Sequence, residues 1–359
     1  MINSPQPGRS CPLHYRYAPA DFARAADFSA QTLYVIGGLY GNVPALEAIH
    51  ALAARETTPV TCVFNGDFNW FNVDDAAFQA INSEVLRHHA NHAIRGNVET
   101  ELADDDESAG CGCAYPDYVS EDDVARSNRI IVRLRETARR HALLRERLGA
   151  LPMNRVADVG GVRVAIVHGD LESLAGWSLA EDFLAQAVVK ETVLKQMLKA
   201  RCQVIASSHT CLPVALTLGS PDSLESSNAA AGSGAINAAI FNNGAAGMPN
   251  FRGAPFGVIT RIATTPAALG ASLYGTRIES SAGSVYADAL PVHYDHARWQ
   301  REFLANWPPG SAAHKSYFQR ITHGPNYAIA RANRLSDFTA NSNSPSVSNN
   351  AVARPTAVV

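Results

Sequence analysis

Short apolar runs recur along the chain, and each of them ends in a turn rich in glycine or polar residues. Apolar runs of about five to seven residues are typical of strands that are buried on both faces. The pattern predicts such strands over 32–38, 60–67, 92–97, 162–169, 202–210, 238–245 and 257–264.

Helical patterns separate the early strands, over 43–56, 74–88 and about 121–148. Ser120 and Asp123 have the spacing of a capping box at the start of the long helix, and Pro152 follows its end. The alternation of strands and helices favours an α/β fold, in which ligands bind at the carboxyl ends of the strands.

The same pattern suggests how the chain is divided. We expect an N-terminal extension over 1–30, one domain over 31–335 with a helical insertion at about 100–152, and a disordered tail over 336–359. The tail has almost no charged or large apolar residues. A run of small residues over 219–236 predicts a second unstructured segment.

Composition changes this picture little. With 359 residues, 47% apolar and 18% charged, the chain is long enough for a substantial core. The net charge of -3 gives no argument for nucleic acid or a membrane surface, and we find neither a membrane span nor a signal peptide. We therefore predict a cytoplasmic protein without a membrane partner; nucleic acid is unsupported and the oligomeric state is open.

The six cysteines do not suggest a disulfide scaffold in a chain of this length. Cys62 and Cys202 lie in strand-like apolar runs and are predicted to pack as small apolar residues. Without an export signal, reduced thiols are the default expectation.

Polar side chains that can bind metals stand at the ends of four predicted strands. They are Asp67 after Gly66, Asn97 after Gly96, His168 before Gly169 and His209 before Thr210. Each alone has an ordinary explanation as a turn, a cap or a hydrogen-bonded core histidine. Together, oxygen and imidazole ligands suit a borderline divalent metal such as Mn, Fe or Zn.

The glycine turn over 37–42 contrasts with these strand ends, because it holds no carboxylate, histidine, cysteine or lysine. A glycine-rich turn between a strand and a helix can bind a phosphate on its backbone N–H groups. This one lacks the spacing of the known nucleotide-binding motifs, so it is a weak signal by itself.

In order and spacing, these motifs resemble those of the calcineurin-like metallophosphoesterases, especially the small bacterial phosphodiesterases. That family reads D-x-H-G-N, G-D, G-N-H-[DE], a lone His and G-H-x-H, and the matching segments here are GGLYGN, FNGD, RGNVE, VHGD and SSHTC. The later FNNGAAGMP and VHYDHARW are similar to its closing segments. The resemblance covers about 32–300 and implies a four-layer α/β/β/α sandwich with its site at the strand ends.

Members of this family bind two metals that share one Asp and hydrolyse phosphate esters with activated water. When the family's motifs are matched to this sequence residue by residue, the resemblance implies that the ligands of one metal are present. They are Asp67, Asn97, His168 and His209. The other residues are replaced: the first Asp by Gly38, its companion His by Tyr40, the last His by Cys211 and the leaving-group His by Val98. Glu99 keeps the acidic position that follows.

The resemblance thus implies one divalent ion (Mn, Fe or Zn), a doubtful second metal, and hydrolysis of a phosphodiester or phosphomonoester. Asp67, Asn97, His168 and Glu99 would serve catalysis, and Asn42, Tyr40 and Gly38 would line the substrate pocket. The missing general acid, typically worth about 10²–10⁴ in rate, favours slow turnover or activated esters.

Other interpretations remain open. The chain could be a non-catalytic relative that binds a phosphorylated ligand or a protein partner through the same cleft. Tyr40 and Cys211 could rebuild a second metal site as phenolate and thiolate ligands. Cys111, Cys113 and Cys211 could instead form a three-thiolate site of a metal or redox sensor, although incidental loop cysteines are the simpler interpretation.

The segment after Asn97 is expected to cover the site. Its acidic run 104–107 is predicted to be a solvated loop. The arginine-rich helix 121–148 is predicted to be an exposed lid with ion pairs inside the helix. The alternative is a basic face that steers a phosphorylated or nucleic-acid substrate.

Overall fold

A computed structural model describes residues 6–87, 91–219 and 238–335. The segment 219–236, apart from its first residue, and the tail 336–359 lie outside the described residues. The predictions of disorder for both are therefore not tested.

The described strands form two sheets. In the seven-stranded sheet the order β1-β5-β6-β7-β9-β8-β13 corresponds to Phe28–Ala30, Asn154–Val159, Val162–Val167, Val204–Ser207, Ala238–Asn242, Val214–Leu218 and Asn333–Arg334. In the six-stranded sheet the order β11-β12-β10-β2-β3-β4 corresponds to Tyr274–Ser280, Gly283–Val292, Gly257–Ala263, Thr32–Ile36, Val60–Asn65 and Asn91–Ile94. Strands β2, β3 and β4 run parallel, as do β6, β7 and β9.

The two sheets pack face to face. Alternate residues of each strand, such as Leu33 and Val35 in β2 and Val164 and Ile166 in β6, meet in one fully buried apolar cluster between the sheets. The residues between them, such as Tyr34, face the helices on the outer side. This two-sided burial explains why the strands read as continuous apolar runs.

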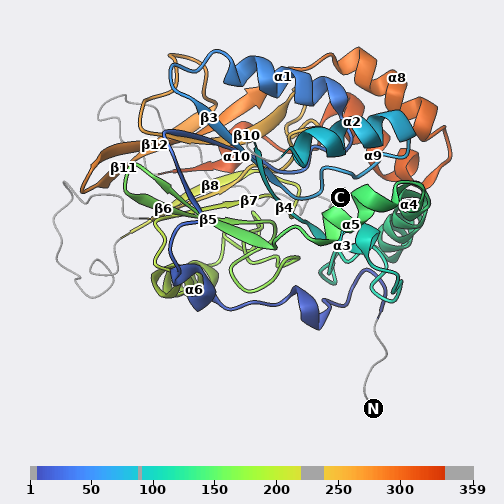
Figure 1. The fold of residues 1–359 in the computed structure, drawn as a ribbon, viewed down its shortest axis with the longest axis horizontal. Coiled ribbons are helices and arrows are strands. Elements are labelled where there is room, and N and C mark those ends of the chain that lie inside the picture. The colour runs from blue at the N-terminus through green and yellow to red at the C-terminus, as the bar shows by residue number, and fades with distance from the viewer. Residues whose placement is uncertain (1–5, 88–90, 220–237, 336–359) are drawn as a thin grey trace, which may run out of the picture.

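Helices cover both outer faces and complete the predicted four-layer α/β/β/α sandwich (Figure 1). The six-stranded sheet is covered by α1 Val43–Ala53, α2 Asp75–Val85, α8 His296–Asn306 and α9 Ala312–His323. The seven-stranded sheet is covered by α6 Ala187–Ala200 and the short η2 Pro19–Ala23. Two further short helices are η1 Leu13–Tyr15 and α10 Ile329–Ala332. None of the described helices is long and apolar enough to cross a membrane.

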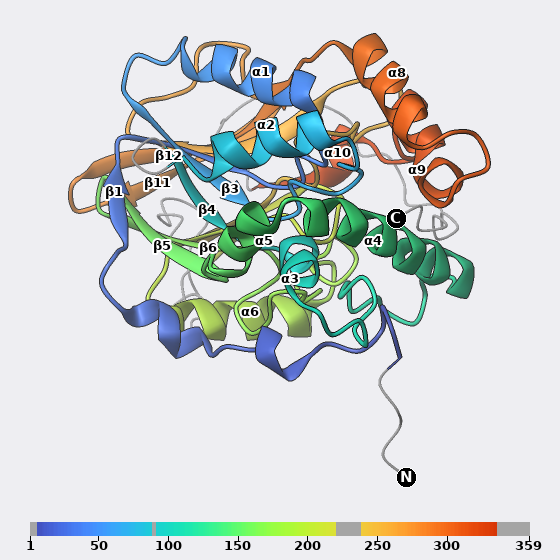
Figure 2. The ribbon, with the colours of Figure 1, turned by 45° about the vertical axis from the view of Figure 1, so that its right-hand side comes forward.

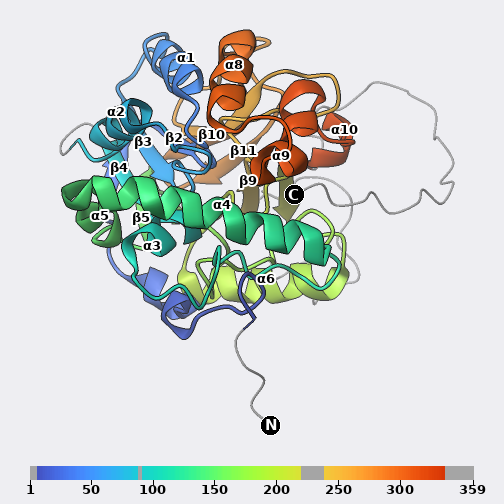
Figure 3. The same ribbon diagram turned by 90° about the vertical axis from the view of Figure 1, so that its right-hand side faces the viewer.

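Three helices cross one end of the sandwich, in the segment for which an insertion was predicted. They are α3 Asn97–Ala103, α4 Glu121–Arg140 and α5 Ala142–Gly149 (Figures 2 and 3). Ser120 caps α4 as predicted, since its side chain accepts a hydrogen bond of 3.1 Å from the Asp123 backbone N–H. The prediction of a single helix over 121–148 is wrong, because the chain leaves the helical conformation at His141 (φ -117°, ψ 57°).

Residues 6–30 pack into the sandwich, although the sequence predicted an N-terminal extension over 1–30. Strand β1 pairs in parallel with β5. Tyr15 and Phe22 are fully buried, and the Tyr15 hydroxyl donates a hydrogen bond of 2.5 Å to Glu101 in α3. This segment therefore contributes to the core, whereas the other predicted domain boundaries stay predictions.

Four of the eight arginines of α4 and α5 pair with acids outside their own helix, so the prediction of intrahelical ion pairs is wrong for these four. These pairs, with their N···O distances, are Arg135–Glu101 (2.6 Å), Arg139–Glu107 (2.8 Å), Arg140–Asp75 (3.0 Å) and Arg145–Asp105 (2.5 Å). Within α4 itself, Arg126 pairs with Asp123 at 2.5 Å. Within the acidic run 104–107, residues 105–107 are exposed as predicted, and Asp105 and Glu107 pair with arginines of these helices.

Candidate metal centre

The predicted ligands come from both sheets and meet at one edge of the sandwich. Asp67 follows β3 and Asn97 begins α3 just after β4, whereas His168 follows β6 and His209 follows β7. All four strands present their carboxyl ends to this edge, where α/β folds usually bind ligands.

Two glycines allow the turns before Asp67 and Asn97 to approach each other. Gly66 has φ 74°, and a Cβ there would lie 2.6 Å from the Gly96 backbone nitrogen and from His168 Nδ1. A Cβ on Gly96 would collide with the Asp67 carboxylate. Asp67 itself has φ 53°, a left-handed conformation that costs about 1–3 kcal/mol in a residue with a side chain. Close packing of these turns thus explains the Gly-Asp and Gly-Asn pairs of the sequence.

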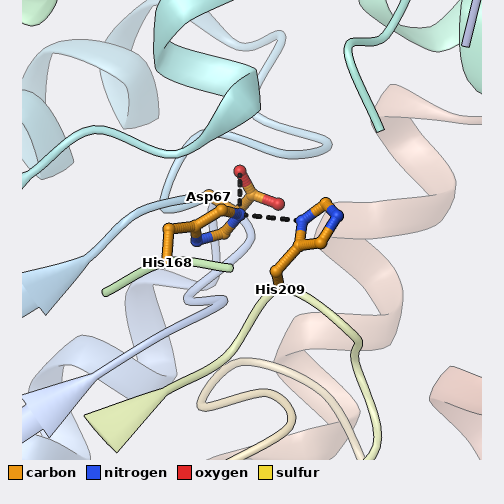
Figure 4. A group of neighbouring side chains, drawn as sticks. All are labelled: Asp67, His168 and His209. Carbon is orange, nitrogen blue, oxygen red and sulfur yellow. Dashed lines mark hydrogen bonds and ion pairs between the residues drawn. The ribbon is translucent and has the colours of Figure 1, made fainter. Parts of the chain in front are cut away.

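The ligand atoms converge on His168 Nε2. This nitrogen lies 3.3 Å from Asp67 Oδ1, 3.1 Å from Asn97 Oδ1 and 3.1 Å from His209 Nδ1. Figure 4 shows the Asp67 carboxylate and the His209 ring pointing toward His168. The ligand atoms of Asp67, His168 and His209 all lie within 4.8 Å of one another. The four side chains are buried, and Asp67 is the most exposed at 7%.

Backbone carbonyl groups fix the orientation of His168, His209 and Asn97. The bonds run from His168 Nδ1 to Asn65 O (3.0 Å), from His209 Nε2 to Cys113 O (3.0 Å) and from Asn97 Nδ2 to Cys111 O (2.9 Å). A carbonyl oxygen only accepts, so each of these nitrogens carries the hydrogen. When His168 is neutral, its Nε2, the His209 Nδ1 and the Asn97 Oδ1 therefore all present lone pairs beside the Asp67 carboxylate, an arrangement that outer hydrogen bonds produce at metal sites.

These facing atoms can be balanced by a proton on His168 Nε2 or by a metal ion bound between them. Ligands at about 2.0–2.2 Å from one ion are about 3.0–3.6 Å apart, and the three distances from His168 Nε2 agree with this spacing. One carboxylate, one amide oxygen and two imidazoles fit Mn, Fe or Zn. The residues thus fit the predicted metal.

The charges of the centre can be worked out from its contacts. Burial alone would raise the pKa of Asp67 and lower that of His168, but their ion pair outweighs burial, so the pKa of Asp67 is lowered and that of His168 is raised. Burial, with the His168 charge beside it, lowers the pKa of His209 to about 3. In the metal-free protein, a proton on His168 therefore lies among the ligands.

Glu99 is adjacent to the centre but does not face it. The fully buried carboxylate accepts hydrogen bonds from the backbone N–H groups of Asp67 (2.7 Å), Gly96 (3.0 Å) and Asn69 (3.1 Å). Burial and the Asp67 charge raise the pKa of Glu99 to about 7. These contacts hold the two turns that carry Asp67 and Asn97, and the catalytic role suggested for Glu99 stays a prediction.

Comparison with known proteins gives structural likeness only. No family model and no curated protein sequence matches the chain. A metallophosphoesterase from Sphaerobacter thermophilus is 18% identical, with a TM-score of 0.48 over 82% of this chain and 99% of that one. A hypothetical protein from Pyrococcus horikoshii is 13% identical, with the same TM-score and the same coverage. A Saccharomyces cerevisiae protein serine/threonine phosphatase is 11% identical, with a TM-score of 0.35 over 77% of this chain and 88% of that one.

The layers of the sandwich and the order of the strand-end motifs agree with the resemblance found in the sequence. In these features the chain resembles the calcineurin-like metallophosphoesterases.

The positions where the second metal of that family would be held are packed against one another. Gly38 has φ 64°, and a Cβ there would lie 2.9 Å from Cζ of Tyr40, so the tyrosine ring occupies the space beside Gly38. The Tyr40 hydroxyl lies 3.0 Å from Cys211 Sγ. Burial raises the pKa of Tyr40 and that of Cys211, so both side chains stay neutral. In the metal-free protein they contact each other as neutral groups, and a second metal site made by them stays a prediction.

Asn42 is likewise used by the fold. It is fully buried, its side chain accepts a hydrogen bond of 2.9 Å from the Ala45 backbone N–H at the start of α1, and it donates one of 2.9 Å to the Gly247 carbonyl. The structure thus gives Asn42, Tyr40 and Gly38 contacts within the fold, and their predicted substrate-lining role stays a prediction.

The loop 104–120 closes over the ligands, as expected. Its Cys111 and Cys113 form a disulfide, so the expectation of reduced thiols is wrong for this pair. Cys62 and Cys202 are buried as predicted. Among the described residues, the three-thiolate cluster with Cys211 is not found.

Sequence reasoning missed the groups that hold the ligands in place. Trp177 Nε1 donates a hydrogen bond of 3.0 Å to the Cys113 carbonyl, and its ring packs edge-on against His209 with centroids 5.3 Å apart. The orienting carbonyls of Asn65, Cys111 and Cys113 have no sequence signature, because every residue carries the same carbonyl group.

Proposed function

We propose that this protein is a metal-dependent phosphoesterase that works through one divalent ion held by Asp67, Asn97, His168 and His209. The observation that carries the proposal is the convergence of four acceptor atoms around His168 Nε2, with three of the side chains held by backbone carbonyls. We propose a phosphodiester or phosphomonoester as the substrate and the cytoplasm as its location.

A bound divalent ion supplies Lewis-acid stabilisation for charge on a phosphoryl oxygen. The chain's own residues set the limits of the reaction. Asp67 is the one ligand that carries a negative charge, and His168 releases its proton when the site is filled. Val98, buried and apolar, cannot protonate a leaving group. We therefore expect aryl or other activated esters to be the better substrates.

A second candidate function is a non-catalytic relative that binds a phosphorylated ligand or a protein partner. The observation that favours it is the closure of the site, since Asp67 and His209 are only 7% and 5% exposed beneath the loop 104–120 and Trp177. A substrate would reach the ligands only after part of this cover moved.

The test begins with metal content per chain, measured by inductively coupled plasma mass spectrometry on protein purified without chelator. We expect about one Mn, Fe or Zn per chain. Turnover of an aryl phosphodiester and an aryl phosphomonoester is then measured with each metal. One metal with turnover supports the phosphoesterase, one metal without turnover supports the non-catalytic relative, and no metal after incubation with each ion contradicts both metal-based proposals.

A further inference from the structure

Three arginines are among the largest fully buried side chains, and one of them differs from the other two. Arg135 forms an ion pair of 2.6 Å with Glu101, and Arg261 forms one of 2.7 Å with Glu56. Within the described residues, Arg320 in α9 has no ion pair. A guanidinium group stays charged, so its charge is buried without a carboxylate to balance it.

The hydrogen bonds of Arg320 show what is missing. Its Nη2 donates a hydrogen bond of 2.6 Å to the Cys211 carbonyl, and its Nε donates one of 3.2 Å to the Pro249 carbonyl. Its Nη1 is buried and has no hydrogen-bond partner among the described residues. Carbonyl dipoles compensate a buried charge only in part, and an unsatisfied charged donor is costly. An anion bound at Nη1 would balance the buried charge of Arg320 and accept a hydrogen bond from its unpaired nitrogen.

Arg320 belongs to the surroundings of the metal centre. The carbonyl it binds is that of Cys211, two residues after His209 in the turn that follows β7. The Cys211 thiol contacts the Tyr40 hydroxyl. The Asp67 charge acts to raise the pKa of both groups and the Arg320 charge acts to lower it, so Tyr40 and Cys211 lie within reach of both charges.

We propose that Arg320 binds a phosphoryl oxyanion through Nη1, beside the metal centre. The chemical class of the ligand rests on the proposed function, whereas the need for an anion rests on the buried charge alone. Guanidinium is the side-chain group best suited to phosphate oxygens. Arg320 supplies a fixed positive charge near Tyr40 and Cys211, the part of the site that holds no metal ligands. Because Nη1 is buried, binding requires a local opening of the residues around it.

The test compares thermal unfolding of the wild type and Arg320→Met, with inorganic phosphate or with chloride at equal ionic strength. We expect phosphate near 100 times its Kd to raise the Tm of the wild type by about 4 °C and to leave that of Arg320→Met unchanged. In chloride, Arg320→Met removes the buried charge but also the hydrogen bonds to the Cys211 and Pro249 carbonyls, so its Tm there serves as that variant's own baseline. Arg261→Met is the matched control; it removes the ion pairs of Arg261 with Glu56 and Asp288 and should lower the Tm.

Two results would overturn the proposal: no effect of phosphate on the wild type, or an equal effect on Arg320→Met. If Arg320→Met does not fold, Arg320→Gln is judged by the same criteria. Repeating the measurement with a phosphodiester in an Asp67→Ala background distinguishes a site for esters from one for free phosphate. The metal content of the same samples distinguishes the proposed metal centre from the proposed anion site. If the wild type is metal-free but phosphate stabilises it through Arg320, the metal centre is contradicted and the anion site is supported.

Discussion

Two neighbouring regions lie at the edge of the sandwich where the strands end, one around His168 and one around Gly38. They differ in the contacts that their polar side chains make. Around His168, two imidazoles, an amide oxygen and a carboxylate face one another. Around Gly38, by contrast, the Tyr40 ring fills the available space and its hydroxyl contacts Cys211. The first region can hold either a proton on His168 or a metal ion at its centre, whereas the second is filled by its own side chains.

The difference between the two regions shows how buried polar side chains pack when they bind no ligand. Buried polar groups without partners are costly, so a site with no ligand to bind is expected to relax into mutual contacts. The region around Gly38 has that character. The region around His168 keeps a costly arrangement, with Asp67 in a left-handed conformation. We infer that a bound cation maintains it.

Replacing Asp67 should produce the largest change. Asp67→Ala removes the charged ligand, and we expect metal affinity to fall by more than about 10²-fold, beyond what the loss of an outer hydrogen bond costs. Metal content should drop from about one ion per chain to nearly none. Asp117→Ala is the matched control, since Asp117 is an exposed acid of the loop 104–120. Equal metal content in both variants would contradict the assignment of Asp67.

Restoring the family's metal-binding residues around Gly38 should produce the next largest change. Gly38→Asp places a side chain at φ 64° against the Tyr40 ring, and we expect it to lower the free energy of unfolding by about 2–4 kcal/mol. Denaturant unfolding measures this loss. Adding Tyr40→His and Cys211→His should recover part of the stability and raise the metal content toward two ions per chain. A triple variant that still holds one ion would show that the second site needs more than these three residues.

Reducing the Cys111–Cys113 disulfide should lower the metal affinity of the site around His168. The carbonyls of these two residues orient Asn97 and His209, and loss of such outer contacts typically costs about 10–100-fold in metal affinity. Competition with a chelator, with and without a dithiol reductant, measures the change. The Cys111→Ser/Cys113→Ser variant is the control, because reductant should have no further effect on it. Unchanged affinity in the reduced wild type would show that the loop holds its shape without the disulfide.

The pH dependence of metal binding should give the smallest effect. The pKa of His168 is raised, so this group stabilises the metal-free protein fully below its ordinary pKa of about 6.5 and less as pH rises through the folded value. Metal binding should release about one proton at pH 6 and fewer at higher pH. The pKa of His209 is about 3, so it should contribute no proton there. Calorimetry in two buffers with different ionisation heats measures the release, and no release at pH 6 would contradict a protonated His168.

The sequence by itself determined which segments are buried and where the polar strand ends lie. Burial patterns are local, so the runs containing β2, β3, β6 and β7 could be recognised, together with the ligands that follow them. Weaker signals failed: β1 is short, and His141 interrupts a helical pattern that reads as continuous. Pattern alone could not show that Tyr40 fills the space beside Gly38, because that contact depends on the path of the turn.

Only the tertiary structure decided how the site is supported. It brought the carbonyls of Asn65, Cys111 and Cys113 to the metal ligands, and it buried the Arg320 charge beside Cys211. Carbonyl groups are identical in every residue, and an arginine reads as exposed unless its neighbours are known. The physical reason is that a side chain's chemistry is encoded locally, whereas its partners are set by contacts between segments far apart in the chain.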